Sequence, residues 1–216
     1  MRQVFQQELA EVSSSLVSTA RLVEQAITYA TTALESSDLE LAERVISADQ
    51  DIDESSIAVD ELTIEIIARQ GPVARDLRQL VAALRISASL ERMGDLAAHV
   101  ASLTRYRFPE PVGPAPLRDI FAEMGRLDVQ VATKTVELLD TLDDSIGTEI
   151  SALDDRIDAL HKQALDLLGT LSDADQVAVV DATLANRYLE RFADHSVSIA
   201  KKIAYLNSGA YSPVSE

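Results

Sequence analysis

The chain of 216 residues contains no cysteine and no tryptophan, and only 4% of its residues are aromatic. Without cysteine it has no disulfide framework, no thiolate metal site and no cysteine nucleophile, and cysteine usage does not indicate a compartment. Seven glycines and few aromatics argue against a β-sandwich or barrel. The surplus of Ala, Leu, Asp, Glu and Ser predicts an all-α chain, and 47% apolar residues are enough for a hydrophobic core.

Positive charge is also scarce, since 36 acidic residues stand against 19 Lys and Arg, for a formal net charge of −17. Such a surface repels phosphate backbones and anionic lipids, so we expect no direct binding to nucleic acid or membrane. The sequence has no run of about 18 apolar residues, the length of a spanning helix. The first residues, MRQVFQQELAEV, lack the apolar core of a signal peptide. We therefore expect a cytoplasmic protein.

A stretch covering residues 77–105 has a second copy near the end of the chain. Leu90, Glu91, Arg92, Asp95 and Ala101 recur as Leu189, Glu190, Arg191, Asp194 and Ala200. Neither copy contains proline, and both are apolar at helical spacing. Their two acids lie four residues apart and therefore share one helix face. The sequence thus predicts an internal duplication.

Apolar periodicity predicts three long helices in each half. They run over residues 4–34, about 39–70, 72 to about 106, about 117–142, about 148–168, and from a cap at Ser172 or Asp173 to residue 206. Pro72 is expected in the first turn of the third helix. The proline-rich segment FPEPVGPAPL, residues 108–117, separates the halves. We predict two tandem, pseudo-repeated three-helix bundles, spanning residues 1–107 and 117–216.

Acid pairs also recur on the middle helix of each half, as Asp49 with Asp53 and Asp154 with Asp158. With so many acids, chance alone gives about six pairs at this spacing, so one pair is uninformative. Four pairs in matching places carry more weight, because like charges four apart destabilise a helix by roughly 0.2 to 0.5 kcal/mol. The compensating partner is either a basic residue of a neighbouring helix or a cation. A solvated acidic face with local ion pairs remains open as the simpler interpretation.

If a cation is the partner, both halves supply carboxylate ligands. The candidate metal ligands are Asp49, Asp53, Glu91, Asp95, Asp154, Asp158, Glu190 and Asp194, with His99 and His161 as additional candidates on the same stripes. Carboxylate with imidazole suits iron, manganese or zinc, whereas carboxylate with water suits magnesium or calcium.

Familiar catalytic patterns are missing from the sequence. It has no glycine-rich phosphate loop, no GxSxG elbow and no HExxH. A ferritin-type di-iron centre needs Glu-x-x-His motifs, and the nearest approach here is the unpaired Asp158 to His161. We therefore expect a non-enzymatic protein. The alternatives are a carboxylate-bridged, metal-dependent oxidoreductase and a metal-binding helical scaffold.

Two motifs carry a family resemblance. The pattern P-x-A-x-DLR is matched by residues 72–78, and the pattern LERIGDHA is approached twice, at residues 90–95 and 189–195. In both motifs, and over nearly its whole length, the chain resembles the PhoU family of bacterial phosphate-signalling regulators. The resemblance implies two three-helix bundles, and it implies metal clusters on the bundle surface at all four acid pairs. The chain departs from the family pattern at Gly71, Leu96 and Ala193, which leaves the metal and the equality of the two sites open.

The resemblance also implies a role. Members of the family are cytoplasmic adaptors that couple a high-affinity phosphate ABC transporter, through its ATPase subunit, to a sensor histidine kinase. They keep phosphate-starvation genes off when phosphate is plentiful. We accordingly expect a negative regulator of phosphate uptake that forms a homodimer and reaches the membrane only through its partners.

Overall fold

The computed structural model describes residues 2–171 and 175–209 and contains six long α-helices and one short 3₁₀ turn. These elements are α1 (Arg2–Ser36), α2 (Leu39–Gln70), α3 (Ala74–Arg107), η1 (Ala115–Leu117), α4 (Arg118–Thr141), α5 (Asp144–Leu168) and α6 (Gln176–Ser208). The described part of the chain contains no strand, so the all-α prediction is confirmed. None of its helices is long and apolar enough to cross a membrane.

Helix ends follow from local chemistry at most of the predicted breaks. Asp38 caps α2, because its carboxylate accepts a hydrogen bond of 3.0 Å from the backbone N–H of Leu41. Gly71 ends the same helix in the left-handed region, with φ of 55°, and its N–H donates to the carbonyl of Ile67. The third helix begins later than predicted. Its N-cap residue, Val73, is extended, so Pro72 lies in the connection rather than in the first turn.

The last helix begins at a cap that the sequence analysis did not select. The two predicted caps, Ser172 and Asp173, lie outside the described residues. Asp175 is the N-cap, and its carboxylate accepts a hydrogen bond of 3.3 Å from the N–H of Val177. At the other end, Gly209 closes α6 with φ of 73°.

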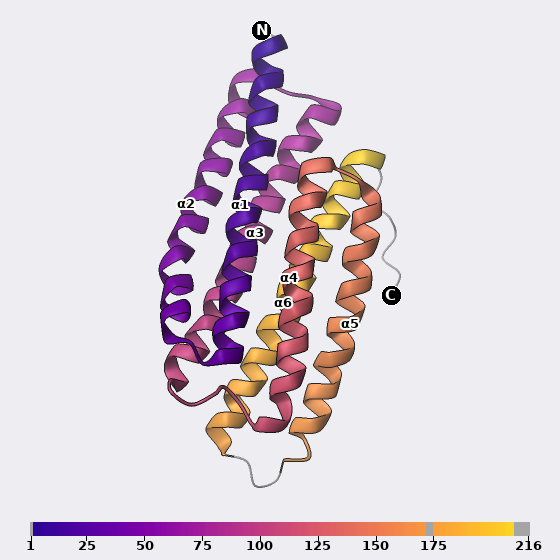
Figure 1. Cartoon of the computed structure of the whole chain (residues 1–216). Coiled ribbons are helices and arrows are strands. Elements are labelled where there is room, and N and C mark those ends of the chain that lie inside the picture. Colours follow the sequence, from indigo (N-terminus) through magenta and orange to yellow (C-terminus); the bar gives the residue numbers. More distant parts are fainter. Residues whose placement is uncertain (1, 172–174, 210–216) are drawn as a thin grey trace.

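The six helices lie side by side along one long axis and form two groups of three (Figure 1). Helices α1, α2 and α3 pack against one another, and α4, α5 and α6 do the same. The groups are joined broadly, because α1 also packs against α4 and α3 against α6. At the first of these contacts, a Cβ on Gly125 would lie 2.9 Å from the side chain of Thr31, so glycine permits the close approach. The division into domains at residues 1–107 and 117–216 stays a proposal.

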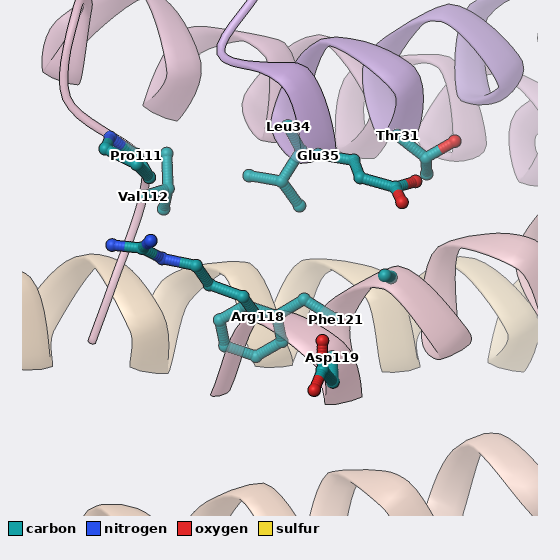
Figure 2. Close-up of a pocket in the computed structure, with 9 residues that line it drawn as sticks. Thr31, Leu34, Glu35, Pro111, Val112, Arg118, Asp119 and Phe121 are labelled. Atoms are coloured by element: carbon teal, nitrogen blue, oxygen red, sulfur yellow. The ribbon is translucent and has the colours of Figure 1, made fainter. Parts of the chain in front are cut away.

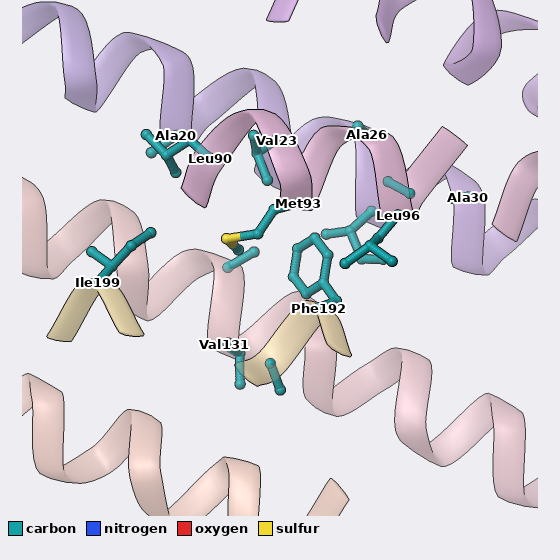
Figure 3. Close-up of a cluster of buried hydrophobic side chains, with 14 of the residues drawn as sticks. Ala20, Val23, Ala26, Ala30, Leu90, Met93, Leu96, Val131, Phe192 and Ile199 are labelled. Atoms are coloured by element: carbon teal, nitrogen blue, oxygen red, sulfur yellow. The ribbon is translucent and has the colours of Figure 1, made fainter. Parts of the chain in front are cut away.

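A single cluster of buried apolar side chains runs through all six helices. Met93 of α3 and Phe192 of α6, which occupy equivalent places in the duplication, are both fully buried and lie at its centre (Figure 3). Ser196 of α6 contacts Met93, with 3.7 Å between Oγ and Sδ. The halves therefore share one hydrophobic core, a feature that the repeat pattern did not predict.

Candidate metal centres

The first acid set consists of Asp49 and Asp53 on α2 with Glu91 and Asp95 on α3. All four side chains are half-buried. Carboxylate oxygens of Asp53, Glu91 and Asp95 lie within 4.8 Å of one another. Helical spacing placed each pair on one face, and packing of α2 against α3 turns the two faces toward each other.

A glycine makes this close arrangement possible. A Cβ on Gly94 would lie 3.0 Å from two carbons of Ile52 and 3.3 Å from Oδ1 of Asp49. Because Ile52 is fully buried between the acids of α2, its side chain has little room to move. Gly94 therefore lets α2 approach α3 at the level of the acid set and brings Asp49 close to α3.

The carboxylates of the first set repel one another. Burial first, and then the charges of Asp53, Asp95 and Glu91, raise the pKa of Asp49 from 3.8 to about 6, while the charge of His99 opposes them. Oδ1 of Asp49 is buried and has no hydrogen-bond partner in the part of the chain that the structure describes. Burial is also the main cause of a raised pKa at Glu91. A buried oxygen without a partner, beside several like charges, is the environment that a bound cation relieves, so these residues fit a metal ion.

Protein cations neutralise this set only in part. Arg92 pairs with Asp95 at 2.7 Å and with Glu91 at 3.5 Å. Its side chain is 61% exposed, so it lies on the solvent side, where an ion pair contributes little to stability. Among the described ion pairs, Arg92 is the only basic residue that contacts this set. The solvated-face interpretation thus accounts for Asp95 and leaves Asp49 unexplained.

The second acid set consists of Asp154 and Asp158 on α5 with Glu190 and Asp194 on α6. Burial, together with repulsion from Asp158, Asp194, Asp155 and Glu190, raises the pKa of Asp154 to about 6. Burial also raises the pKa of Glu190, and the charge of Asp194 adds to this effect. Arg187, which pairs with Glu190 at 2.6 Å, lowers the pKa of Glu190. The structure thus brings all four predicted acids together here as well.

The two sets differ in compactness. Asp194 is exposed, whereas its counterpart Asp95 is half-buried. Within the described ranges, only the first set has three donor atoms inside 4.8 Å. The duplication therefore produces two acid sets with different geometry.

Both predicted imidazoles lie beside the acids. His99 is exposed and stacks on Tyr188, with 5.1 Å between ring centroids, and its charge lowers the pKa of Asp49. His161 is half-buried, its Nδ1 has no hydrogen-bond partner, and its charge lowers the pKa of Glu190. Their placement agrees with the predicted stripes. Their role as ligands stays a prediction.

Sequence reasoning missed one acid. Asp128 on α4 is fully buried, and neither of its carboxylate oxygens has a hydrogen-bond partner among the described residues. Burial raises its pKa well above the usual range, and the charge of Asp154 adds to this. The available signal was an acid in the middle of the apolar stripe of the fourth helix, between Met124 and Val131. Asp128 was not recognised because it has no acidic partner four residues away.

A further pocket lies where the end of α1 meets the proline-rich segment 108–117 and the start of α4 (Figure 2). Its charged side chains are Glu35, Arg118 and Asp119, beside apolar groups such as Val112 and Phe121. No member of either acid set lines it. We therefore take the acid sets, and not this pocket, as the candidate functional centres.

Fold and site together define a class: a duplicated helical bundle in which each half carries acids from two adjacent helices. A family profile described as the PhoU domain matches residues 16–104 and 121–203. The phosphate-specific transport system accessory protein PhoU homolog 2 of Mycobacterium bovis is 37% identical, over 98% of this chain and 100% of its own length. The chain belongs to the PhoU family.

Other relatives agree with this assignment. The phosphate-specific transport system accessory protein PhoU of Serratia marcescens is 29% identical over 95% of this chain and 85% of its own length. The crystal structure of PhoU from Pseudomonas aeruginosa superposes with a TM-score of 0.89 at 29% identity, covering 95% of this chain and 100% of that one. The fold is thus similar to a known PhoU structure over 95% of this chain.

Proposed function

We propose that this protein is a phosphate-transport accessory protein, a non-enzymatic cytoplasmic adaptor that negatively regulates phosphate uptake and the phosphate-starvation response. In this role it couples a phosphate ABC transporter, through the ATPase subunit, to a sensor histidine kinase, and it acts as a homodimer. The observation that carries the proposal is the match to a named phosphate-specific transport accessory protein across 98% of the chain. The phosphate-transport role comes from that relative's name, and the kinase coupling rests on the family resemblance.

We further propose that both acid sets bind multivalent cations such as iron, manganese, zinc or magnesium. Oxygens of Asp53, Glu91 and Asp95 would hold the ion in the first set, with Asp49 on the buried side. A bound ion would supply positive charge between two helices. The carboxylates belong to neighbouring helices in each half, so together they tie α2 to α3 and α5 to α6 in the cation-bound state.

The regulatory proposal is tested by a clean deletion in the source organism. Loss of the protein should switch on phosphate-uptake genes even in high phosphate, and a wild-type copy should restore repression. The protein should also capture the transporter ATPase subunit or the kinase from phosphate-replete cells. Unchanged expression in a strain without a paralogue contradicts the proposal. Turnover of oxygen or peroxide by metal-loaded protein would instead support the oxidoreductase alternative.

The cation proposal is tested by elemental analysis of the purified chain and by thermal melting with and without a chelator. At a hundred times the dissociation constant, a bound ion stabilises the fold by about 2.7 kcal/mol. Asp95→Asn and Asp194→Asn should each reduce bound metal with little loss of helicity. Asp51→Asn is the matched control, because Asp51 lies on α2 beside the first set but is exposed. Equal metal content in all three variants and the wild type would exclude the acid sets as the binding sites.

A further inference from the structure

Asp128 occupies a position where an acid is costly. It is 0% exposed, and both of its oxygens lack a hydrogen-bond partner. Its neighbours along the same stripe of α4 include the buried apolar residues Met124 and Val131. An ionised carboxylate in such surroundings requires a counter-charge, and a neutral one still requires hydrogen bonds. Among the described residues, no side chain supplies either one.

The register of α4 against α5 brings Asp128 to the second acid set. The two helices are antiparallel (Figure 1). Ion pairs join them on either side of Asp128. These pairs are Arg156 with Glu123 at 3.3 Å and Lys134 with Glu149 at 2.8 Å. Each residue advances a helix by about 1.5 Å, so the distance of Asp128 from each ion pair along α4 can be transferred to α5. Both pairs then place Asp128 at the same height as residues 151–155 of α5. Asp154 lies in that segment, and its charge acts on Asp128.

The register of α4 against α6 leads to the same place. These helices run parallel, and Thr135 of α4 donates a hydrogen bond of 3.1 Å to Oγ of Ser196. Two turns earlier on both helices, about 10 Å along the axis, stand Asp128 and Leu189. Leu189 precedes Glu190 of the second acid set. Asp128 is therefore at the level of this set, on the core side of the second bundle.

The first half has no equivalent acid. Residues 21–28 of α1 and 126–133 of α4 share the pattern Arg-Leu-x-x-Gln-x-x-Thr, and this alignment matches Asp128 with Val23. Val23 is 1% exposed and forms part of the apolar core. The equivalent position of the first bundle is thus occupied by an apolar residue that packs in the core. Among the described residues, the second half therefore has a buried carboxylate at a place where the first half has valine.

We propose that Asp128 is an inner ligand of the second acid set, so that the second half binds a divalent cation with five carboxylates, deeper in its bundle than the first half does. This inference rests on the proposed cation binding by the acid sets. Asp154 and Glu190 supply oxygens from α5 and α6, and Asp128 supplies one from α4 on the core side. A cation held there links all three helices of the second bundle, whereas the first set links two.

The test is a Mn²⁺ titration of the purified full chain, followed by calorimetry and by the EPR signal of free Mn²⁺. Wild-type protein should show two classes of site. Asp128→Val, which reproduces the first half, should weaken one class of site at least tenfold and leave the other unchanged. Asp95→Asn should do the reverse. Asp128→Asn is a second, isosteric variant that guards against a folding defect of the valine variant and should weaken the same class.

Melting temperatures with and without Mn²⁺ distinguish a metal-binding role of Asp128 from a purely structural one. Without metal, Asp128→Val should melt at or above the wild-type temperature, because a buried acid has been replaced by a residue that fits. With saturating Mn²⁺ the order should reverse. If the titrations of Asp128→Val, Asp128→Asn and wild type coincide while Asp95→Asn loses a site, Asp128 is not a ligand although the acid sets still bind cations. If wild-type protein binds no Mn²⁺, both this inference and the cation proposal are wrong.

Discussion

Replacing Asp49 with asparagine should stabilise the cation-free protein at neutral pH. Its carboxyl is half-buried, has an unpartnered oxygen and faces three other acids of the first set. Asparagine has nearly the same shape and no charge, so it removes the repulsion and keeps the packing against Gly94. A stabilising substitution at a charged position would be unusual for a solvated helix face, where such changes have small effects.

The sign and size follow from the pKa. Asp49 has a pKa of about 6 in the folded chain against 3.8 for an unperturbed carboxyl, so between these values the folded state binds more protons than the unfolded state. The free energy of unfolding therefore falls as pH rises from about 4 to about 6 and is lowest above that range. A shift of about two units corresponds to about 3 kcal/mol. Because the side chain is partly solvated, we expect Asp49→Asn to gain about 1 to 2 kcal/mol at pH 7.5.

The assay is urea unfolding in a chelating buffer at several pH values from 4.5 to 7.5. Asp51→Asn is the control, since it removes the same charge from the exposed side of α2. The gain from Asp49→Asn should be small at pH 4.5 and full at pH 7.5, and saturating Mn²⁺ should favour the wild type. A loss of stability of equal size at both pH values would refute the reasoning, because it would mean that the Asp49 carboxylate is stabilised by protein partners.

Three further predictions concern how the helices pack. Gly94→Ala should weaken Mn²⁺ binding at the first set and lower the free energy of unfolding by about 1 kcal/mol, because overpacking outweighs the gain in helix propensity. Ala193→Gly should lower the free energy of unfolding by a similar amount with no change in Mn²⁺ affinity. Mn²⁺ titration and urea unfolding measure both effects. Phe192→Ala should cost about 3 to 5 kcal/mol in a single transition, and two separate calorimetric transitions would contradict a shared core. Arg107→Ala should cost about 1 to 3 kcal/mol, because it leaves buried Asp181 of α6 without its partly exposed partner, and adding Asp181→Asn should recover part of the loss in the same urea assay.

Much of this molecule was predictable from local pattern. Apolar spacing is a property of each helix alone, so the six helices and most of their ends could be read from periodicity and from residues such as Asp38 and Gly71. The duplication then placed an acid pair on the middle and last helix of each half. Because those helices are adjacent in a three-helix bundle, the pairs were expected to meet, and the structure brings them together.

Other features depend on how helices dock, which spacing along one helix does not specify. The sequence places Asp128 on the core stripe of the fourth helix, but its level against Asp154 depends on the axial register of α4 and α5. The clearance at Gly94 makes the first set compact, and that distance exists only once α2 lies against α3. The shared core around Met93 likewise arises from contact between the halves. Register and interhelical distance are set by the interlocking of side chains from both surfaces, so they emerge only when the helices pack.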